Sequence, residues 1–119
     1  FAYIAPEIVR GEIVDSRADI FSWGIIAWEL LARRRLFSAL HPEAIFKKIV
    51  ESKIPSLSSF LLGIPSALSI IIDRALQQNR AARYRTSQEL WDDLLSIKKS
   101  DNYQRAMEAS LPWPLELVR

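Results

Sequence analysis

The segment over residues 17–33 constrains the fold more than any other part of the chain. Large apolar residues recur in it so closely that they would cover every side of a helix. They are Ile20, Phe21, Trp23, Ile25, Ile26, Ala27, Trp28, Leu30 and Leu31. A helix that is apolar all round is stable in water only when other elements cover it. We therefore expect a buried central helix, around which the rest of the chain packs.

The same segment is too short to cross a membrane. Its apolar stretch over residues 20–32 is interrupted by Ser22, Gly24 and Glu29, whereas a membrane-spanning helix needs roughly 20 consecutive apolar residues. The composition suits a small folded domain, because 50% of the 119 residues are hydrophobic. We expect one small domain, or part of one, with no membrane segment.

The charged and metal-binding residues exclude several classes of function. The 16 Lys and Arg residues against 14 Asp and Glu give a net charge of +2, which predicts no nucleic-acid partner. The chain has no cysteine, and its single histidine, His41, has no second imidazole with which to bind a metal. The sequence therefore predicts neither a disulfide framework nor a metal site.

Periodic apolar residues predict further helices and no strand. Pro42 suits the first turn of a helix over residues 42–52. Ser66 is a capping residue for the next helix, and Thr86 with Glu89 forms a capping box for the last one. The apolar faces of these helices are formed by Ile45, Phe46, Ile49, Val50, Leu68, Ile71, Ile72, Ala75, Leu76, Leu90, Trp91, Leu94 and Leu95. The expected fold class is all-α.

The segments between these helices are expected to be irregular. The first residues show no period and predict at most a short helical turn over residues 7–10. Ser16 with Asp19 has the pattern of a capping box at the start of the central helix. Residues 53–65 contain prolines, a glycine and serines, and predict a loop whose middle packs on the core through the apolar residues 60–62.

Several short motifs occur in an order that resembles the protein kinase family. In chain order they are Ala5-Pro6-Glu7, Asp19 at the head of the central helix, Glu29-Leu30-Leu31, Phe37 and Arg83. Each motif is common by itself, whereas their joint order and spacing resemble the lower part of the kinase C-terminal lobe. The sequence looks most similar to the bacterial serine/threonine kinases of eukaryotic type.

This resemblance implies an all-α fold that runs from the Ala-Pro-Glu motif through the last kinase helix. Residues 1–100 would form a partial kinase domain, and residues 101–119 a C-terminal tail of unknown role. Because the chain starts inside a motif and lacks an initial Met, we expect it to be a piece of a larger protein. The missing upstream kinase lobe would then be a partner of this segment.

The resemblance implies structural support roles for Glu7, Arg83 and Asp19. In kinases the glutamate of the Ala-Pro-Glu motif forms a buried ion pair with an arginine before the last helix, which Arg83 matches. That pair would fix the substrate-facing loop to the lobe. Asp19 matches an aspartate that accepts hydrogen bonds from the catalytic loop. Without the resemblance, Glu7 and Arg83 would be unrelated surface charges, and Asp19 would be a helix-capping residue.

Other residues match kinase positions near the substrate. Phe1, Ala2, Tyr3 and Ile4 resemble the end of the loop that receives the substrate residue after the phosphoacceptor. Glu29 matches a position that meets basic substrate residues in some kinases. Its carboxylate would equally suit pairing with a neighbouring arginine, so both interpretations of Glu29 remain open.

The central helix carries two residues that match supports of the apolar column beneath the adenine ring. These residues are Ile26 and Leu30, and they are equally ordinary core residues. Without the elements that kinases place upstream, the central helix is also expected to expose apolar surface at Ile20, Trp23 or Trp28 and to self-associate.

One departure from the kinase pattern lies at the end of the central helix. Kinases often have glycine at the position of Arg33, where the chain makes a left-handed turn, and proline at that of Leu36. A non-glycine residue in such a turn costs about 1 kcal/mol or forces another turn. We expect the loop after this helix to be less sharply defined.

The resemblance implies that the parent protein transfers the γ-phosphate of ATP to Ser or Thr residues of protein substrates, with Mg²⁺ as a cofactor. The chain itself contains no His-Arg-Asp or Asp-Phe-Gly motif, and its 3 glycines are isolated. We therefore expect no catalytic residue in this segment, no ATP or Mg²⁺ bound by it alone, and no activity. The expected location of the parent protein is cytoplasmic.

Two other classes of function remain open. A pseudokinase or a truncated lobe would keep the helical scaffold and use the surface around the helix over residues 42–52 to bind proteins. An unrelated all-α adaptor would share the periodicity but would have no reason to keep Glu7, Asp19 and Arg83 in this order. The sequence upstream of Phe1 discriminates an active kinase from a pseudokinase.

Overall fold

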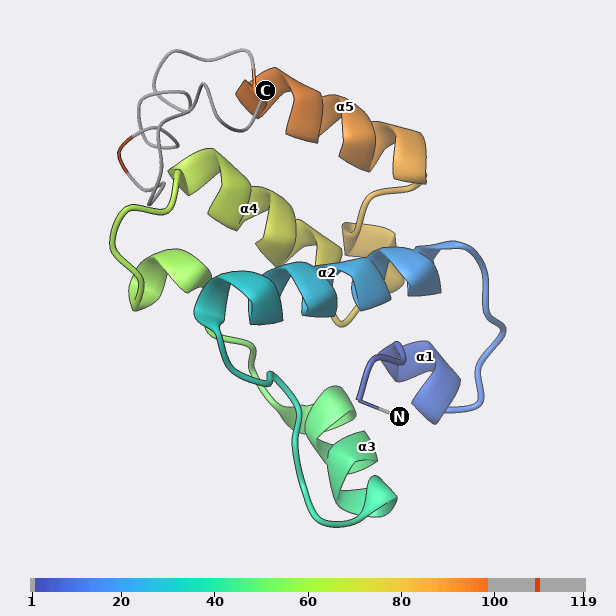
Figure 1. Cartoon of the computed structure of the whole chain (residues 1–119). Helices are drawn as coiled ribbons and strands as arrows, with labels where there is room; N and C mark the ends of the chain where they lie inside the picture. Colours follow the sequence, from blue (N-terminus) through green and yellow to red (C-terminus); the bar gives the residue numbers. More distant parts are fainter. Residues whose placement is uncertain (1, 99–108, 110–119) are drawn as a thin grey trace.

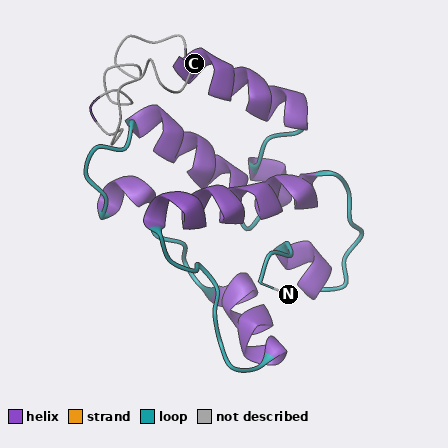
Figure 2. Ribbon diagram, viewed as in Figure 1, coloured by secondary structure: helices purple, strands orange, loops and turns teal. Residues whose placement is uncertain are grey.

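The computed structural model of the chain describes residues 2–98 and residue 109. Its helices are α1 (Pro6–Val9), α2 (Arg17–Ala32), α3 (Pro42–Glu51), α4 (Ser66–Ala75) and α5 (Ser87–Lys98) (Figure 1). Short 3₁₀ turns, η1 (Leu57–Ser59) and η2 (Arg80–Ala82), precede α4 and α5. The described residues contain no strand, which confirms the all-α fold class (Figure 2).

Helix α2 lies at the centre of the molecule, as its sequence predicts. Figure 1 shows it between α4 and α5 on one side and α1 and α3 on the other. It packs directly on α4, which in turn packs on α5, while α1 packs on α3. Among the described residues, none of the helices has both the length and the hydrophobicity needed to span a bilayer. The predicted tail over residues 101–119 lies outside the described residues, apart from residue 109.

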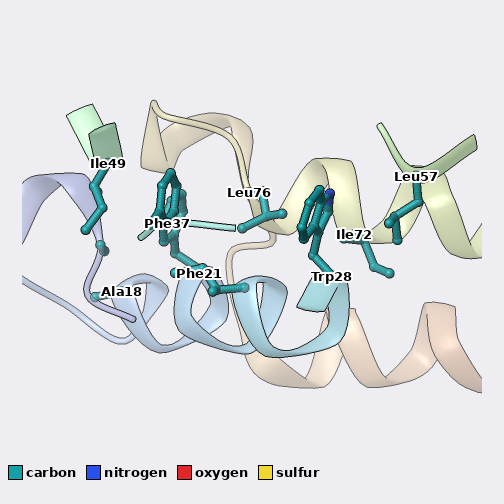
Figure 3. Close-up of a cluster of buried hydrophobic side chains, with 10 residues drawn as sticks. Ala18, Phe21, Trp28, Phe37, Ile49, Leu57, Ile72 and Leu76 are labelled. Carbon is teal, nitrogen blue, oxygen red and sulfur yellow. The ribbon is translucent and has the colours of Figure 1, made fainter. Parts of the chain in front are cut away.

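The main core forms where α2 packs against α4 and against the segments that follow α2 and precede α4. Its buried members are Ala5, Ala18, Phe21, Ile25, Trp28, Phe37, Ile49, Leu57, Ile72 and Leu76 (Figure 3). Trp28 is 1% exposed, and its indole N–H donates a hydrogen bond of 2.9 Å to the carbonyl oxygen of Pro55. Gly24 allows α2 and α4 to approach closely, because a Cβ atom at Gly24 would lie 2.8 Å from Cγ of Leu76.

The expectation that α2 is buried on every side is wrong for one face. Ile26 is 49% exposed and Leu30 is 73% exposed. The expected exposure of Ile20 and Trp28 is also wrong, because they are only 3% and 1% exposed. Ile20 is covered by residues of α4 and α5, and Trp28 by the core around η1. Trp23 is partly buried. The uncovered apolar surface of α2 therefore lies around Ile26 and Leu30.

Both ends of α2 differ in detail from the sequence expectation. Ser16 has helical backbone angles and makes no side-chain cap. Asp15 caps the helix instead, because its Oδ1 accepts a hydrogen bond of 2.9 Å from the backbone N–H of Arg17. At the other end, Arg33 adopts the left-handed conformation with φ of 57°. The turn that kinases often build with glycine is thus kept with an arginine.

The loop over residues 53–65 packs on the core through Leu57 and through Leu61, and only Leu61 belongs to the expected residues 60–62. Leu57 is fully buried, whereas Leu62 is fully exposed and Phe60 is 39% exposed. Leu57 is buried because it belongs to η1, whose 3₁₀ turn directs its side chain into the core cluster. Helix α4 is preceded by Pro65 as its N-cap, so Ser66 is its first residue and not its cap.

The predicted capping box of α5 is present in a shifted form. The backbone N–H of Glu89 donates to Oγ1 of Thr86 at 3.2 Å, and Oε2 of Glu89 accepts from the backbone N–H of Arg85 at 3.1 Å. The carboxylate thus reaches one residue further back than the capping-box pattern requires. Trp91 is 56% exposed and therefore does not share the buried face of α5 with Leu90.

Candidate functional site

The N-terminal loop over residues 2–5 leads into α1, and a buried ion pair holds α1 at the base of this loop. In the described structure, Nη1 of Arg83 donates to Oε2 of Glu7 at 2.7 Å, and Nη2 donates to Oε1 at 2.7 Å. Both residues are 2% exposed. They are 76 positions apart in the sequence, and the pair joins α1 to the segment between η2 and α5. The structure therefore brings together the two residues that the resemblance pairs.

The remaining donors of Arg83 are also satisfied. Nε donates to the carbonyl oxygen of Gln77 at 2.8 Å, Nη1 to that of Arg17 at 3.0 Å, and Nη2 to that of Gln78 at 3.2 Å. The guanidinium carbon lies 4.9 Å from the centroid of the Phe21 ring. A buried charge needs a partner and full hydrogen bonding. Arg83 meets both needs and links α1, the start of α2 and the segment after α4.

The surroundings of Glu7 favour its ionised form. Burial raises the pKa of the carboxyl group, but its hydrogen bonds to Arg83 and to its own backbone N–H lower it. The positive charges of Arg83 and Arg80 act in the same lowering direction. The net result is a Glu7 pKa below its ordinary value, so this carboxylate is charged at neutral pH.

A second carboxylate holds the start of the same loop. The hydroxyl of Tyr3 donates to Oε1 of Glu29 at 2.5 Å, and the backbone N–H of Leu36 donates to Oε2 at 2.9 Å. The hydroxyl of Ser22 donates to the carbonyl oxygen of Tyr3 at 2.5 Å. The hydrogen bond to Glu29 is the main cause that raises the pKa of Tyr3. Tyr3 is thereby fixed on α2, and Glu29 connects it to the segment after α2.

Four of the predicted site residues line one shallow depression. It has a volume of about 320 Å³ and is lined by Tyr3, Ile26, Glu29 and Leu30. The substrate-loop candidates Tyr3 and Glu29 therefore lie beside the candidate column supports Ile26 and Leu30. The described residues contain no group of His, Asp or Glu side chains that could hold a metal ion.

The other predicted site residues lie apart from this depression. Ala2 is 7% exposed, and Ile4 is partly buried against the main core. Phe1 lies outside the described residues. Asp19 is exposed on the first turn of α2, and its carboxylate has no hydrogen-bond partner within the described part of the chain. Its predicted contact with a catalytic loop stays a prediction.

Sequence reasoning identifies Tyr3 and Glu29 separately but does not pair them. It also misses Ser22, because a single hydroxyl inside an apolar helix gives no functional signal. The signal for Ser22 is positional, since the residue lies one turn of α2 after Ala18 and faces the loop that contains Tyr3. Among the residues that the structure describes, no arginine pairs with Glu29, and its carboxylate binds a tyrosine and a backbone N–H.

Comparison with known proteins shows the family of this chain. The family model described as "Protein kinase domain" matches residues 1–105. The serine/threonine-protein kinase PknB of Mycobacterium tuberculosis is 30% identical over 100 residues, which cover 83% of this chain and 16% of that protein. The serine/threonine-protein kinase PksC of Streptomyces coelicolor is 30% identical over 110 residues, with 92% of this chain and 19% of that protein covered.

The fold is similar to that of a solved kinase structure. A twitchin kinase region from C. elegans superimposes with a TM-score of 0.69 at 20% sequence identity, over 77% of this chain and 16% of that one. At this identity the likeness concerns the fold alone. The chain spans less than a fifth of the length of the kinases it matches. Since the family model covers almost the whole sequence, the chain belongs to the protein kinase family.

Proposed function

We propose that the chain is part of a serine/threonine protein kinase that transfers the γ-phosphate of ATP to Ser or Thr residues of a protein substrate. The observation that carries this proposal is the buried bidentate pair between Glu7 and Arg83. A helical adaptor with no active site to support would not need a buried charge pair under a surface loop. The names of the bacterial relatives support the same substrate class.

In this proposal the segment supplies the substrate-side scaffold. The pair between Glu7 and Arg83 holds the base of the loop that receives the substrate, and the bond between Tyr3 and Glu29 holds its start. Asp19 is exposed at the head of α2, where it is able to accept hydrogen bonds from an upstream catalytic loop. Ile26 and Leu30 form the exposed apolar surface on which the column beneath the adenine would rest.

ATP and Mg²⁺ are proposed as cofactors of the parent kinase, and its partners are the protein substrate and the upstream kinase lobe. The family's ATP-binding lysine and catalytic aspartate belong to motifs that do not occur in these 119 residues. The segment alone is therefore proposed to be inactive. The cytoplasmic location of the parent protein stays a prediction, as does the division into residues 1–100 and 101–119.

The test is a phosphoryl-transfer assay on the protein encoded by the reading frame extended upstream of Phe1. With labelled ATP, Mg²⁺ and a Ser- and Thr-containing protein substrate, the extended protein should transfer phosphate, and the 119-residue chain should not. Glu7→Gln in the extended protein should reduce transfer. Arg85→Gln is the matched control, because Arg85 is an exposed arginine near Arg83 and lies outside the ion pair.

The same assay distinguishes an active kinase from the alternative, a pseudokinase or docking module. A pseudokinase or docking module would bind a protein partner through the surface around α3 but would transfer no phosphate, and its upstream motifs would be degenerate. Phosphate transfer by the 119-residue chain itself would contradict the proposed division between scaffold and catalytic parts.

A further inference from the structure

The carboxylate in the depression beside Tyr3 is already occupied by hydrogen-bond donors of the chain itself. Both oxygens of Glu29 accept hydrogen bonds, one from the Tyr3 hydroxyl and one from the Leu36 backbone N–H. Glu29 is the acidic residue of this surface, since the other residues that line the depression are Tyr3, Ile26 and Leu30. A basic peptide side chain would therefore share one carboxylate with two donors that already hold it in place.

The chain that follows α2 is strongly basic. Arg33, Arg34 and Arg35 are consecutive, and residues 30–42 contain no Asp or Glu. All three arginines are exposed. The hydrogen bond from the Leu36 backbone to Glu29 joins the end of this arginine segment to a residue that lines the depression, and we call residues 33–36 the rim. The rim therefore carries three arginines and no acidic residue.

The three arginines are not equivalent. The guanidinium of Arg34 lies 5.4 Å from the ring centroid of Trp28 and 4.8 Å from that of Phe60, so it is engaged by aromatic rings. The side chains of Arg33 and Arg35 form no hydrogen bond or ion pair within the described part of the chain. Arg35 directly precedes Leu36, and its positive charge lowers the pKa of Tyr3 against the larger raising effect of the hydrogen bond to Glu29. Arg35 is thus the unpaired cation nearest in sequence to the backbone group that binds Glu29.

We propose that this rim binds an acidic peptide segment, with Arg35 as the residue that meets the acidic side chain. This proposal rests on the proposed function, because it assigns a substrate class to the same substrate-side surface. A guanidinium recognises carboxylate or phosphate oxygens through paired N–H donors. Carboxylate side chains and a phosphorylated residue share this chemistry, and separate peptides distinguish them.

The test measures the binding of fluorescein-labelled peptides to the 119-residue chain by fluorescence anisotropy. The peptides carry one serine flanked by Glu, by Gln or by Lys, and a further peptide carries phosphoserine beside Gln. At low salt the Glu peptide should bind about fivefold more tightly than the Gln peptide, which is the upper range for an exposed ion pair. The preference should decrease at physiological ionic strength, because salt screens exposed charges.

Charge variants identify the residue responsible. Arg35→Glu should remove the preference for the Glu peptide, and Arg35→Gln should weaken it. Arg85→Glu is the matched control and should leave the preference unchanged, because Arg85 is an exposed arginine in the segment before α5. Circular dichroism of each variant checks that the helices are intact.

Several results would overturn the proposal. They are tighter binding of the Lys peptide, no measurable binding of any peptide, an unchanged preference in Arg35→Glu, and equal competition by a short DNA duplex, which would show a general attraction to polyanions. Tighter binding of the phosphoserine peptide would support the shared anionic chemistry and assign it to phosphate. Peptide binding needs no ATP. A failed phosphoryl-transfer assay would therefore overturn the proposed function, whereas a failed binding measurement would overturn only the proposed peptide site.

Discussion

Two carboxylates hold the N-terminal loop, and their environments differ. Glu7 is 2% exposed and binds the Arg83 guanidinium through both oxygens. Glu29 is partly exposed and binds a neutral phenol and a backbone N–H. Breaking the buried contact strands a charge in the core, whereas water can replace the exposed hydrogen bond at little cost. The loop is therefore fixed at its base and adjustable at its start.

The largest expected effect comes from removing one partner of the buried pair. Arg83→Met should lower the free energy of unfolding by about 3 to 5 kcal/mol, because it leaves the Glu7 carboxylate buried without its cation. Urea denaturation followed by circular dichroism measures this loss. Arg85→Met is the control, and as an exposed substitution it should change stability by less than about 0.5 kcal/mol.

A double variant tests whether the loss comes from the unpaired charge. Glu7→Leu combined with Arg83→Met should recover part of the stability lost by Arg83→Met alone, because neither charge then remains buried. If Arg83→Met unfolds at the same urea concentration as the unmodified chain, the contrast between the two carboxylates does not hold.

Acid should weaken the buried contact between Glu7 and Arg83. The folded-state pKa of Glu7 is lowered, so its stabilising contribution is present above the ordinary value of 4.5 and is lost as the pH falls through the lowered folded value. The urea midpoint should therefore decrease as the pH drops below 4.5. Glu7→Gln should be less stable at neutral pH and should show a smaller decrease in acid.

An exposed carboxyl group gives the control for this pH dependence. The hydrogen bonds of Arg17 lower the pKa of Asp15 to about 2, yet Asp15 is exposed. Asp15→Asn should therefore keep most of the acid sensitivity of the unmodified chain. Equal acid sensitivity in Glu7→Gln would mean that other carboxylates cause the loss of stability.

A smaller effect is expected at the turn that follows Glu29 at the end of α2. Arg33 has φ of 57°, and its backbone N–H donates to the carbonyl oxygen of Glu29 at 2.8 Å. Arg33→Gly should raise the free energy of unfolding by about 1 kcal/mol, because glycine adopts this conformation without strain. Arg34→Gly is the control and should destabilise the chain, since it removes contacts with Trp28 and Phe60. A less stable Arg33→Gly variant would contradict this account of the turn.

The smallest effect is expected for the exposed hydrogen bond itself. Tyr3→Phe should lower the free energy of unfolding by about 0.5 kcal/mol, because Tyr3 is 37% exposed and water can replace its partner. Tyr84→Phe is the comparison, since Tyr84 is 1% exposed and its hydroxyl donates to Asp93 at 2.7 Å. Tyr84→Phe should cost more. If the two variants lose equal stability in urea denaturation, exposure does not explain the difference between the two contacts.

The helices can be predicted from the sequence because they depend on local spacing. The recurrence of apolar residues predicts the bounds of α2 and the buried face of α4. Caps are harder, because Asp15 and Ser16 are adjacent and both suit the N-cap position. The exposed face of α2 cannot be predicted in this way, since the spacing of Ile26 and Leu30 does not specify which elements cover them.

The site depends on contacts that no local pattern contains. Glu7 and Arg83 are 76 positions apart, and only the resemblance to kinases pairs them. Tyr3 and Glu29 are 26 positions apart, and the resemblance names both without joining them. Arg35 belongs to no recognised motif, and its position near Glu29 follows from the hydrogen bond between the Leu36 backbone and Glu29.

The carbonyl groups around Arg83 have a consequence for the order of folding. They belong to Arg17, Gln77 and Gln78, so they come together only after α2 and α4 have docked. The contact with Glu7 also closes 76 residues of chain, and the entropy lost must be offset by contacts that form earlier. We therefore expect the N-terminal loop to become ordered last. An ordered N-terminal loop would then indicate that α2 and α4 have already docked.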